Sequence, residues 1–345
     1  MKKLLIINFI LLVFVVSCSR ATYDKQTYSH IPDVIKIVGT PITLPDSIFF
    51  AYPQMKIKDS LCCIWDQSFQ KKHFHIFTFP GFEYIYSLAH VGRGYNEIIQ
   101  PGDFDLTTHY LYAYDLNLKK LYSYDVKNRA SKPNECIDYN MLKLYDAQRF
   151  CMIGDSLAAF YTTNIQNIIY IIDKKGNMMD SLLKRPLLND WNYHMISSSW
   201  NSCISFLHGN IVCATISAEV IDVVNISNKK HRIFVGPGGK PRPLQRGNSF
   251  LPVSFFGFQN IFLTDNYIYT LFSGMTWDEY REKSKAKQNT DKNYIRVYDY
   301  NGNLINVYDT DENLLSIYVD ESANKIYATV YDNENSIYVY EMPNI

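Results

Sequence analysis

The stretch "RVYDYNGNLINVYD", residues 296–309, contains the pattern that decides the fold. Apolar or aromatic residues alternate with polar ones on both sides of an Asn-Gly-Asn turn, which predicts two half-buried strands joined by a tight reversal. A close copy, "YIIDKKGNMMDSLL", occupies residues 170–183. In both copies the first strand ends in Asp and the chain reverses at Gly-Asn, so one strand–turn–strand unit is expected at both places.

Looser copies of this unit recur along the chain. They lie at residues 75–88, 121–130, 220–235 and 337–343. The spacing is roughly 45 residues once a helix-like insertion is left out, and six such units are typical of a β-propeller. We therefore predict an all-β fold, a six-bladed β-propeller with a short helical insertion near residues 274–293.

The ring needs one more strand to close. The last unit ends at Ile345, which leaves no residues for the outermost strand of the final blade. The segment "DVIKIVGTPITL", residues 33–44, alternates in the same way and precedes the first full unit. We predict that this N-terminal strand pairs with the final blade and closes the ring.

The first residues form a targeting signal. Two lysines precede a short apolar run, residues 4–16, which is too short for a helix to cross a bilayer core of about 30 Å. The "VVSC" that follows resembles the bacterial lipobox, in which the cysteine, here Cys18, is diacylated; an ordinary signal peptide with an incidental cysteine is the alternative. The predicted organisation is a signal peptide over residues 1–17, a lipid-anchored tether over 18–32 and a propeller over 33–345.

Charge and cysteine placement exclude several classes of partner. Lys+Arg and Asp+Glu both number 34, so no global field attracts nucleic acid. The cysteines other than Cys18 lie mostly in apolar runs such as Cys62–Cys63, which favours buried thiols over disulfides. His73 and His75 have a spacing that can chelate a metal, but no third ligand is near, so surface histidines are favoured. We expect no metal, no cofactor and a monomer.

One longer segment resembles a known family. Residues 90–125 are similar to the TolB-like six-bladed propeller lipoproteins of Bacteroides-type bacteria, in which a G-x-G-x-x-E loop leads through a Pro and an Asp-Phe pair into a Tyr-rich strand pair. A second, degenerate copy lies at residues 234–274. The resemblance spans nearly the whole chain after the signal and implies an architecture rather than an activity, because propellers host enzymes, scaffolds and receptors alike. The positions that carry it are Gly92, Gly94, Glu97, Pro101, Asp103 and Phe104.

The loop "VGRGYNEI", residues 91–98, is not a phosphate-binding loop. Glu97 stands where a dinucleotide fingerprint needs its third glycine, and no helix pattern follows. We expect Gly92 and Gly94 to permit positive φ where the chain leaves the outer strand of one blade for the inner strand of the next. Glu97 is expected to accept loop N–H groups or to pair with Arg93. Because such crossovers are expected beside the channel mouth, Arg93 and Glu97 are candidate ligand-binding residues.

A serine-rich aromatic segment supplies further candidates. Residues 190–202, "DWNYHMISSSWNS", hold Trp191, His194 and Trp200 beside four serines. Aromatic rings beside polar groups suit a carbohydrate or peptide surface, and packing between blades is the alternative. The serines lack the G-x-S-x-G context of a nucleophile elbow, and no catalytic residue is assigned.

The most basic irregular segment, residues 236–248, holds Arg242 and Arg246. Long loops inside compact domains are often functional, so these two arginines are candidate contacts for an anionic ligand; a solvated loop is the alternative.

The function expected from these features is binding. The leading hypothesis is an exported lipoprotein, anchored in the bacterial cell envelope at its periplasmic face or at the cell surface. It would act as a non-enzymatic binding or scaffold module for an envelope protein, peptide or glycan through its loop face and channel. The alternative is a propeller hydrolase or lyase acting on glycan or peptide. Three or more buried ionisable groups meeting at the channel mouth would favour that enzyme.

Overall fold

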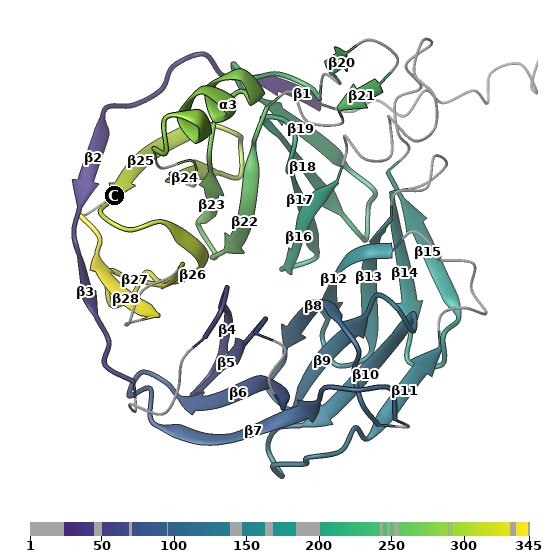
Figure 1. Ribbon diagram of the computed structural model, residues 1–345. Coiled ribbons are helices and arrows are strands. Elements are labelled where there is room, and N and C mark those ends of the chain that lie inside the picture. The colour runs from purple at the N-terminus through teal and green to yellow at the C-terminus, as the bar shows by residue number, and fades with distance from the viewer. Residues whose placement is uncertain are drawn as a thin grey trace, which may run out of the picture.

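The chain folds into a ring of six radially arranged sheets around a central channel (Figure 1). This confirms the predicted six-bladed β-propeller. The computed structural model describes residues 24–44, 50–68, 71–94, 96–138, 147–162, 168–183, 201–241, 244–246, 249–251, 255–288, 290, 292–331 and 336–343.

Each of the first three blades is an antiparallel sheet of four strands that follow one another in the chain. Blade 1 contains β4 (Gln54–Lys58), β5 (Leu61–Trp65), β6 (Lys72–Thr78) and β7 (Tyr84–His90). Blade 2 contains β8 (Pro101–Leu106), β9 (Tyr110–Asp115), β10 (Lys120–Asp125) and β11 (Glu135–Asp138). Blade 3 contains β12 (Ala147–Ile153), β13 (Leu157–Thr162), β14 (Ile169–Asp173) and β15 (Met178–Leu182).

The last three blades follow the same plan. Blade 4 contains β16 (Ser202–Leu207), β17 (Asn210–Thr215), β18 (Val220–Asn225) and β19 (His231–Val235). Blade 5 contains β22 (Phe258–Leu263), β23 (Tyr267–Phe272), β24 (Tyr294–Asp299) and β25 (Leu304–Thr310). Blade 6 contains β26 (Leu314–Asp320), β27 (Lys325–Val330) and β28 (Ile337–Glu341). A separate hairpin, β20 (Leu244–Arg246) and β21 (Ser249–Leu251), lies between blades 4 and 5 in the chain.

The N-terminal segment lies along the outside of three successive blades (Figure 1). Strand β1 (Asp24–Thr27) pairs in parallel with β19, β2 (Val34–Ile37) pairs in parallel with β25, and β3 (Gly39–Pro41) pairs antiparallel with β28. Strand β3 confirms the predicted closure of the final blade. The pairings of β1 and β2 were not predicted, and β1 falls within residues assigned to the tether, because alternation along a strand does not tell which sheet edge it joins.

The repeated turn has the same hydrogen bonds in both copies that define the repeat. The Asp173 carboxylate accepts the backbone N–H of Asn177 at 2.8 Å, and the Asp299 carboxylate accepts that of Asn303 at 2.8 Å. Gly302, at φ 89°, lies in the left-handed region that favours glycine. Both turns join the third and fourth strands of their blades, so the sequence repeat corresponds to one blade.

Each interface between neighbouring blades holds its own buried cluster. Between blades 1 and 2 the rings of Phe74 and Phe104 lie 5.4 Å apart, and between blades 2 and 3 those of Tyr114 and Phe160 lie 5.3 Å apart. Large aromatic residues bury about 150–250 Å² each, so a few per interface fill the widening space between blades. This packing fixes the inner strands that surround the channel.

The predicted insertion forms helix α3 (Trp277–Lys285). It is shorter than the segment 274–293 and begins at a capping box in which Thr276 and Glu279 exchange hydrogen bonds. The helix buries no residue fully, and Trp277 stacks on Phe256 at 5.9 Å. Within the part of the chain described, no helix has the length and apolar character needed to cross a membrane.

Candidate functional site

The largest described cavity lies inside the ring. The innermost strands of the blades are β4, β8, β12, β16, β22 and β26 (Figure 1). Residues toward the ends of these strands, and the turns that follow them, line a cavity of about 700 Å³. Residues near the beginnings of β4, β8, β12, β22 and β26 line two smaller cavities. All six strands therefore run in the same direction along the channel, and the large cavity lies at the end where each first strand turns into the second.

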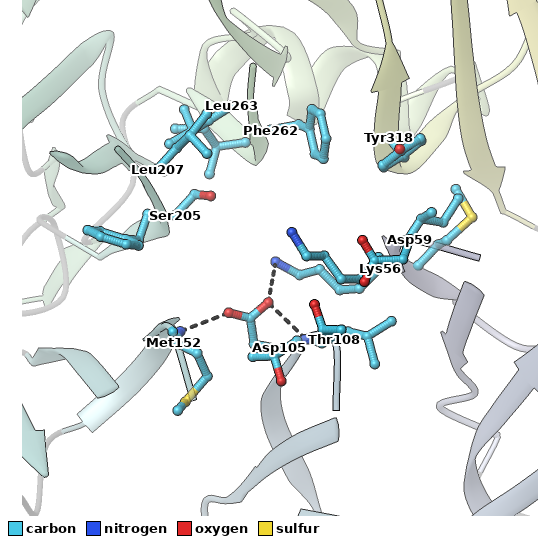
Figure 2. Close-up of a pocket in the computed structure, with 18 of the residues that line it drawn as sticks. Lys56, Asp59, Asp105, Thr108, Met152, Ser205, Leu207, Phe262, Leu263 and Tyr318 are labelled. Carbon is cyan, nitrogen blue, oxygen red and sulfur yellow. Dashed lines mark hydrogen bonds and ion pairs between the residues drawn. The ribbon is translucent and has the colours of Figure 1, made fainter. Parts of the chain in front are cut away.

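One wall of this cavity carries an ion pair between two blades. Lys56 Nζ on β4 lies 3.8 Å from Asp105 Oδ1 on β8 (Figure 2). Burial lowers the pKa of the Lys56 ammonium, but the nearby Asp105 and Asp103 carboxylates outweigh this effect and raise the pKa overall. Lys56 is therefore a charged group facing the cavity, and among the described residues it has no hydrogen-bond acceptor.

The carboxylate of Asp105 is already occupied by backbone donors. Its Oδ2 accepts the N–H of Met152 at 2.8 Å, and its Oδ1 accepts the N–H of Leu106 at 3.0 Å (Figure 2). Met152 lies on β12, so this side chain joins the inner edges of blades 2 and 3.

Asp103 repeats this arrangement two residues earlier on β8. Its Oδ2 accepts the N–H of Phe150 at 3.1 Å, and its Oδ1 lies 3.9 Å from Arg149 Nη1. Burial raises the pKa of Asp103, while Arg149 and Lys56 oppose that rise.

The opposite wall is apolar. Phe262, Leu263, Leu207 and Tyr318 project from blades 4, 5 and 6 and face the charged side across the cavity (Figure 2). The rings of Phe262 and Tyr318 meet edge to face at 5.0 Å. The cavity thus offers an ammonium donor on one side and an aromatic surface on the other.

Two histidine–aspartate pairs lie at the turns that line the cavity. His109 Nδ1 is 2.9 Å from Asp155 Oδ2, and His208 Nε2 is 2.8 Å from Asp265 Oδ1. His109, Asp155 and His208 line the cavity, so both pairs place polar side chains beside it.

Four ionisable side chains lie along the inner strands of blades 1 to 3, and two of them, Lys56 and Asp105, line the large cavity. Lys56, Asp103, Asp105 and Arg149 are each partly buried. Their carboxylates bind the backbone of the next blade, so the arrangement is that of an inter-blade brace. Among the described residues, no group of three or more His, Cys, Asp and Glu side chains could hold a metal ion.

Comparison with known proteins agrees with this architecture. The family model described as TolB-like 6-blade propeller-like matches residues 34–322. The chain belongs to this family. No curated protein matches it.

Two solved structures share the fold of this TolB-like propeller. An exported protein from Bacteroides fragilis superposes with a TM-score of 0.62 at 13% identity, covering 92% of this chain and 98% of its own. A member of the DUF4221 family from Bacteroides vulgatus gives a TM-score of 0.55 at 11% identity, covering 90% and 96%. At these identities the likeness shows the fold alone.

The G-x-G loop of this TolB-like propeller joins β7 to β8, as predicted. Gly94 N–H donates to Glu97 Oε2 at 2.7 Å, which is one of the two roles expected for Glu97. The prediction of positive φ at Gly92 and Gly94 is wrong. Both glycines instead allow the close approach of Glu97, because a Cβ on either would lie within 3.0 Å of its carboxyl group and force that side chain to move. Arg93 is exposed, and neither Arg93 nor Glu97 lines the cavities described above.

Of the other predicted site residues, the structure describes only Arg246. Cys18, Trp191, His194, Trp200 and Arg242 lie outside the described residues. Arg246 ends strand β20, where its backbone pairs with Ser249.

Two predictions about buried groups have different outcomes. His73 is not at the surface: it is buried, with Nε2 3.0 Å from the Ile98 carbonyl oxygen. The thiols of Cys62, Cys63, Cys151, Cys203 and Cys213 are free and buried, as predicted.

The charged wall, formed by Lys56, Asp103, Asp105 and Arg149, was not predicted from the sequence. Asp103 and Asp105 stand two residues apart in the stretch "GDFDL", which lies in β8, so both lie on the same face of that strand. Two carboxylates on one face of an inner strand were the available signal. The sequence around Lys56 gave no such signal, because its partner Asp105 is 49 residues away in the chain and belongs to another blade.

Proposed function

We propose that this TolB-like propeller is an exported, lipid-anchored binding module of the bacterial cell envelope, and that its ligand occupies the large channel cavity. The carrying observation is Lys56, a charged ammonium without a hydrogen-bond acceptor among the described residues, facing an aromatic wall. A pocket with an apolar surface and a few placed polar groups is the usual form of a small-ligand site. Export is supported by the description of the Bacteroides fragilis neighbour as exported.

The ligand class follows from the two walls. An anionic or strongly accepting group would hydrogen-bond to Lys56, and an aromatic or aliphatic group would pack against Phe262 and Tyr318. A short peptide with a free carboxylate and an aromatic side chain combines both features. A cavity of about 700 Å³ is within the range that such ligands occupy.

The binding test uses matched peptides and the purified full chain. Calorimetric titration with Ala-Ala-Phe and with its C-terminal amide should show at least tenfold tighter binding of the free carboxylate. Lys56→Met should remove that preference, whereas Lys36→Met, an exposed lysine on β2, should retain it. Equal affinity of the two peptides, or no binding of either, would contradict the proposed ligand class.

The same samples test the alternative function, a hydrolase or lyase. Mass spectrometry of the peptides and of oligosaccharides after incubation should show unchanged substrates if the module only binds. Turnover that disappears in Asp105→Asn would establish the enzyme instead.

Lipid anchoring has its own test. Cys18→Ala should release the protein from the membrane fraction, because acyl chains bury about 0.8 kcal/mol per methylene and supply the attachment. Unchanged membrane association of that variant would refute lipidation at Cys18.

A further inference from the structure

A second cavity, of about 320 Å³, opens at the other end of the channel between blades 5, 6 and 1. Its lining has a composition unlike that of the large cavity. Among the described residues it contains two tyrosines, three amides and leucines, and no charged side chain. The residues used below are Tyr52, Gln54, Gln259, Asn313, Leu315 and Tyr331.

Irregular backbone places several of these side chains. Gln259 is the extra residue of a β-bulge between Phe258 and Asn260 on β22, and Leu315 is the extra residue of the corresponding bulge on β26. A bulge leaves one residue out of the ladder and changes the direction of its side chain, and bulges are common beside functional sites. Tyr52 has a φ of 51°, a left-handed conformation that is unfavourable for a tyrosine and recurs at ligand sites.

The two tyrosines form one aromatic surface. Their ring centroids lie 4.5 Å apart, and the Tyr52 hydroxyl donates to that of Tyr331 at 2.9 Å. Tyr52 remains half exposed, at 50%. Tyr52 precedes β4 and Tyr331 follows β27, so the first and last blades contribute together.

Two of the amides beside this surface, Gln54 and Gln259, have groups available for hydrogen bonds to a ligand. Gln259 Oε1 accepts the side-chain N–H of Asn293 at 2.8 Å, which fixes the amide and leaves its NH₂ group as a donor. Gln54 has no side-chain hydrogen bond among the described residues. It also lines an adjacent cavity of about 200 Å³ together with Gln67 and Gln100. Four of the ten glutamines in the chain therefore gather at this mouth of the channel.

We propose that this mouth binds a neutral saccharide. A sugar hydroxyl both donates and accepts hydrogen bonds, and an amide side chain offers two donors and an acceptor with two lone pairs. The tyrosine surface offers an apolar face with polar edges for the C–H face of a sugar ring. Among the described residues, the lining of the 320 Å³ cavity contains no ammonium, guanidinium or carboxylate, so nothing there would compensate a charged ligand for lost hydration. Arg149, in the adjacent 200 Å³ cavity, already lies beside the Asp103 carboxylate. This site is separate from the large cavity in position and in chemistry.

The experiment is a glycan array probed with the purified full chain, followed by calorimetric titration of the neutral oligosaccharides that bind. The uronic acid counterpart of each positive sugar is the charged comparison. Neutral sugars should bind, and the uronic acids should bind at least tenfold more weakly.

Two variants locate the site. Gln54→Leu keeps the side-chain volume, removes an amide with no described hydrogen bond in the protein, and should weaken binding at least tenfold. Tyr52→Gly is compatible with the left-handed backbone, removes one of the two rings of the aromatic surface and should also weaken binding at least tenfold. Tyr84→Ala, which removes an exposed tyrosine from the outer strand of blade 1, should leave binding unchanged.

Three results would overturn the proposal. They are no neutral saccharide bound on the array, binding unaffected by both Gln54→Leu and Tyr52→Gly, and peptides bound at this mouth in place of sugars. Lys56→Met should not alter saccharide binding, so failure of the saccharide proposal can be distinguished from failure of the proposed peptide site.

Discussion

The Glu97 carboxylate accepts the backbone N–H of Gly94 at 2.7 Å in the first G-x-G loop. The second, degenerate copy has an equivalent contact, in which Gly238 N–H donates to Glu219 Oε2 at 2.6 Å. Glu97 follows its glycines in the chain, whereas Glu219 precedes Gly238 by 19 residues and comes from a turn within blade 4. Both loops are therefore bound by a glutamate carboxylate, but the two glutamates come from different positions in the sequence.

The close approach of Glu97 makes Gly92 sensitive to substitution. Gly92→Ala would place a methyl group within the Glu97 carboxylate, so the loop must shift or lose its hydrogen bond. We expect a loss of about 1–3 kcal/mol in the free energy of unfolding. Urea unfolding followed by tyrosine fluorescence measures it. Gly81→Ala is the matched control, because the nearest heavy atom to a Cβ there is Thr78 Oγ1 at 3.3 Å. Equal stability of the two variants would show that the loop accommodates the methyl group.

Glu219 also forms a buried ion pair with Arg296, which links blades 4 and 5. The Tyr28 hydroxyl donates to Glu219 at 2.7 Å, and the Arg296 guanidinium lies 3.6 Å from the centre of the Phe272 ring. Arg296→Ala would leave the Glu219 carboxylate buried without its cation, at a cost of about 3–5 kcal/mol in unfolding free energy. Arg281→Ala, on the exposed face of α3, should cost less than about 0.5 kcal/mol.

A double variant separates the ion pair from packing. Adding Glu219→Ala to Arg296→Ala should cost clearly less than the sum of the two single losses, because no unpaired charge is then buried. Strict additivity would show that the two side chains act independently.

Short repeated sequence patterns predicted the six-bladed ring, whereas contacts between blades could not be read from such patterns. The Asp and Asn side chains that close the repeated turn, such as Asp299 and Asn303, lie four residues apart, so their hydrogen bonds could be anticipated from the chain itself. The contacts of Glu219 with Gly238 and of Lys56 with Asp105 join segments whose proximity depends on the closed ring. No periodicity in one strand specifies them. For that reason the fold was predictable, whereas the pairing of Lys56 with Asp105 and the tyrosine–amide mouth were not.

Ring closure depends on a close approach at Gly39. A Cβ there would lie 2.7 Å from the Tyr340 ring, and Gly39 N–H donates to Asp311 Oδ1 at 3.0 Å. Gly39→Val should therefore disrupt the pairing of β3 with β28 and reduce the free energy of unfolding by about 1–3 kcal/mol. Amide hydrogen exchange in β28 should accelerate along with it. Thr40→Val, at the exposed neighbouring position, should change neither quantity appreciably.

The buried His73 predicts a loss of stability in acid. Burial disfavours the charged imidazolium and lowers the pKa of His73 from its ordinary value of 6.5. Between the folded and unfolded pKa values the unfolded chain binds more protons. This contribution to stability is therefore complete above about pH 6.5 and is lost as the pH falls through the folded pKa. The urea concentration at the unfolding midpoint should decrease as the pH is lowered from 7 to 5. His73→Gln should reduce the pH dependence of the free energy of unfolding by up to about 1.4 kcal/mol per pH unit. The same substitution at the exposed His30 reports the effect of losing a surface histidine. An identical pH dependence in His73→Gln and the unsubstituted chain would exclude His73 as the titrating group.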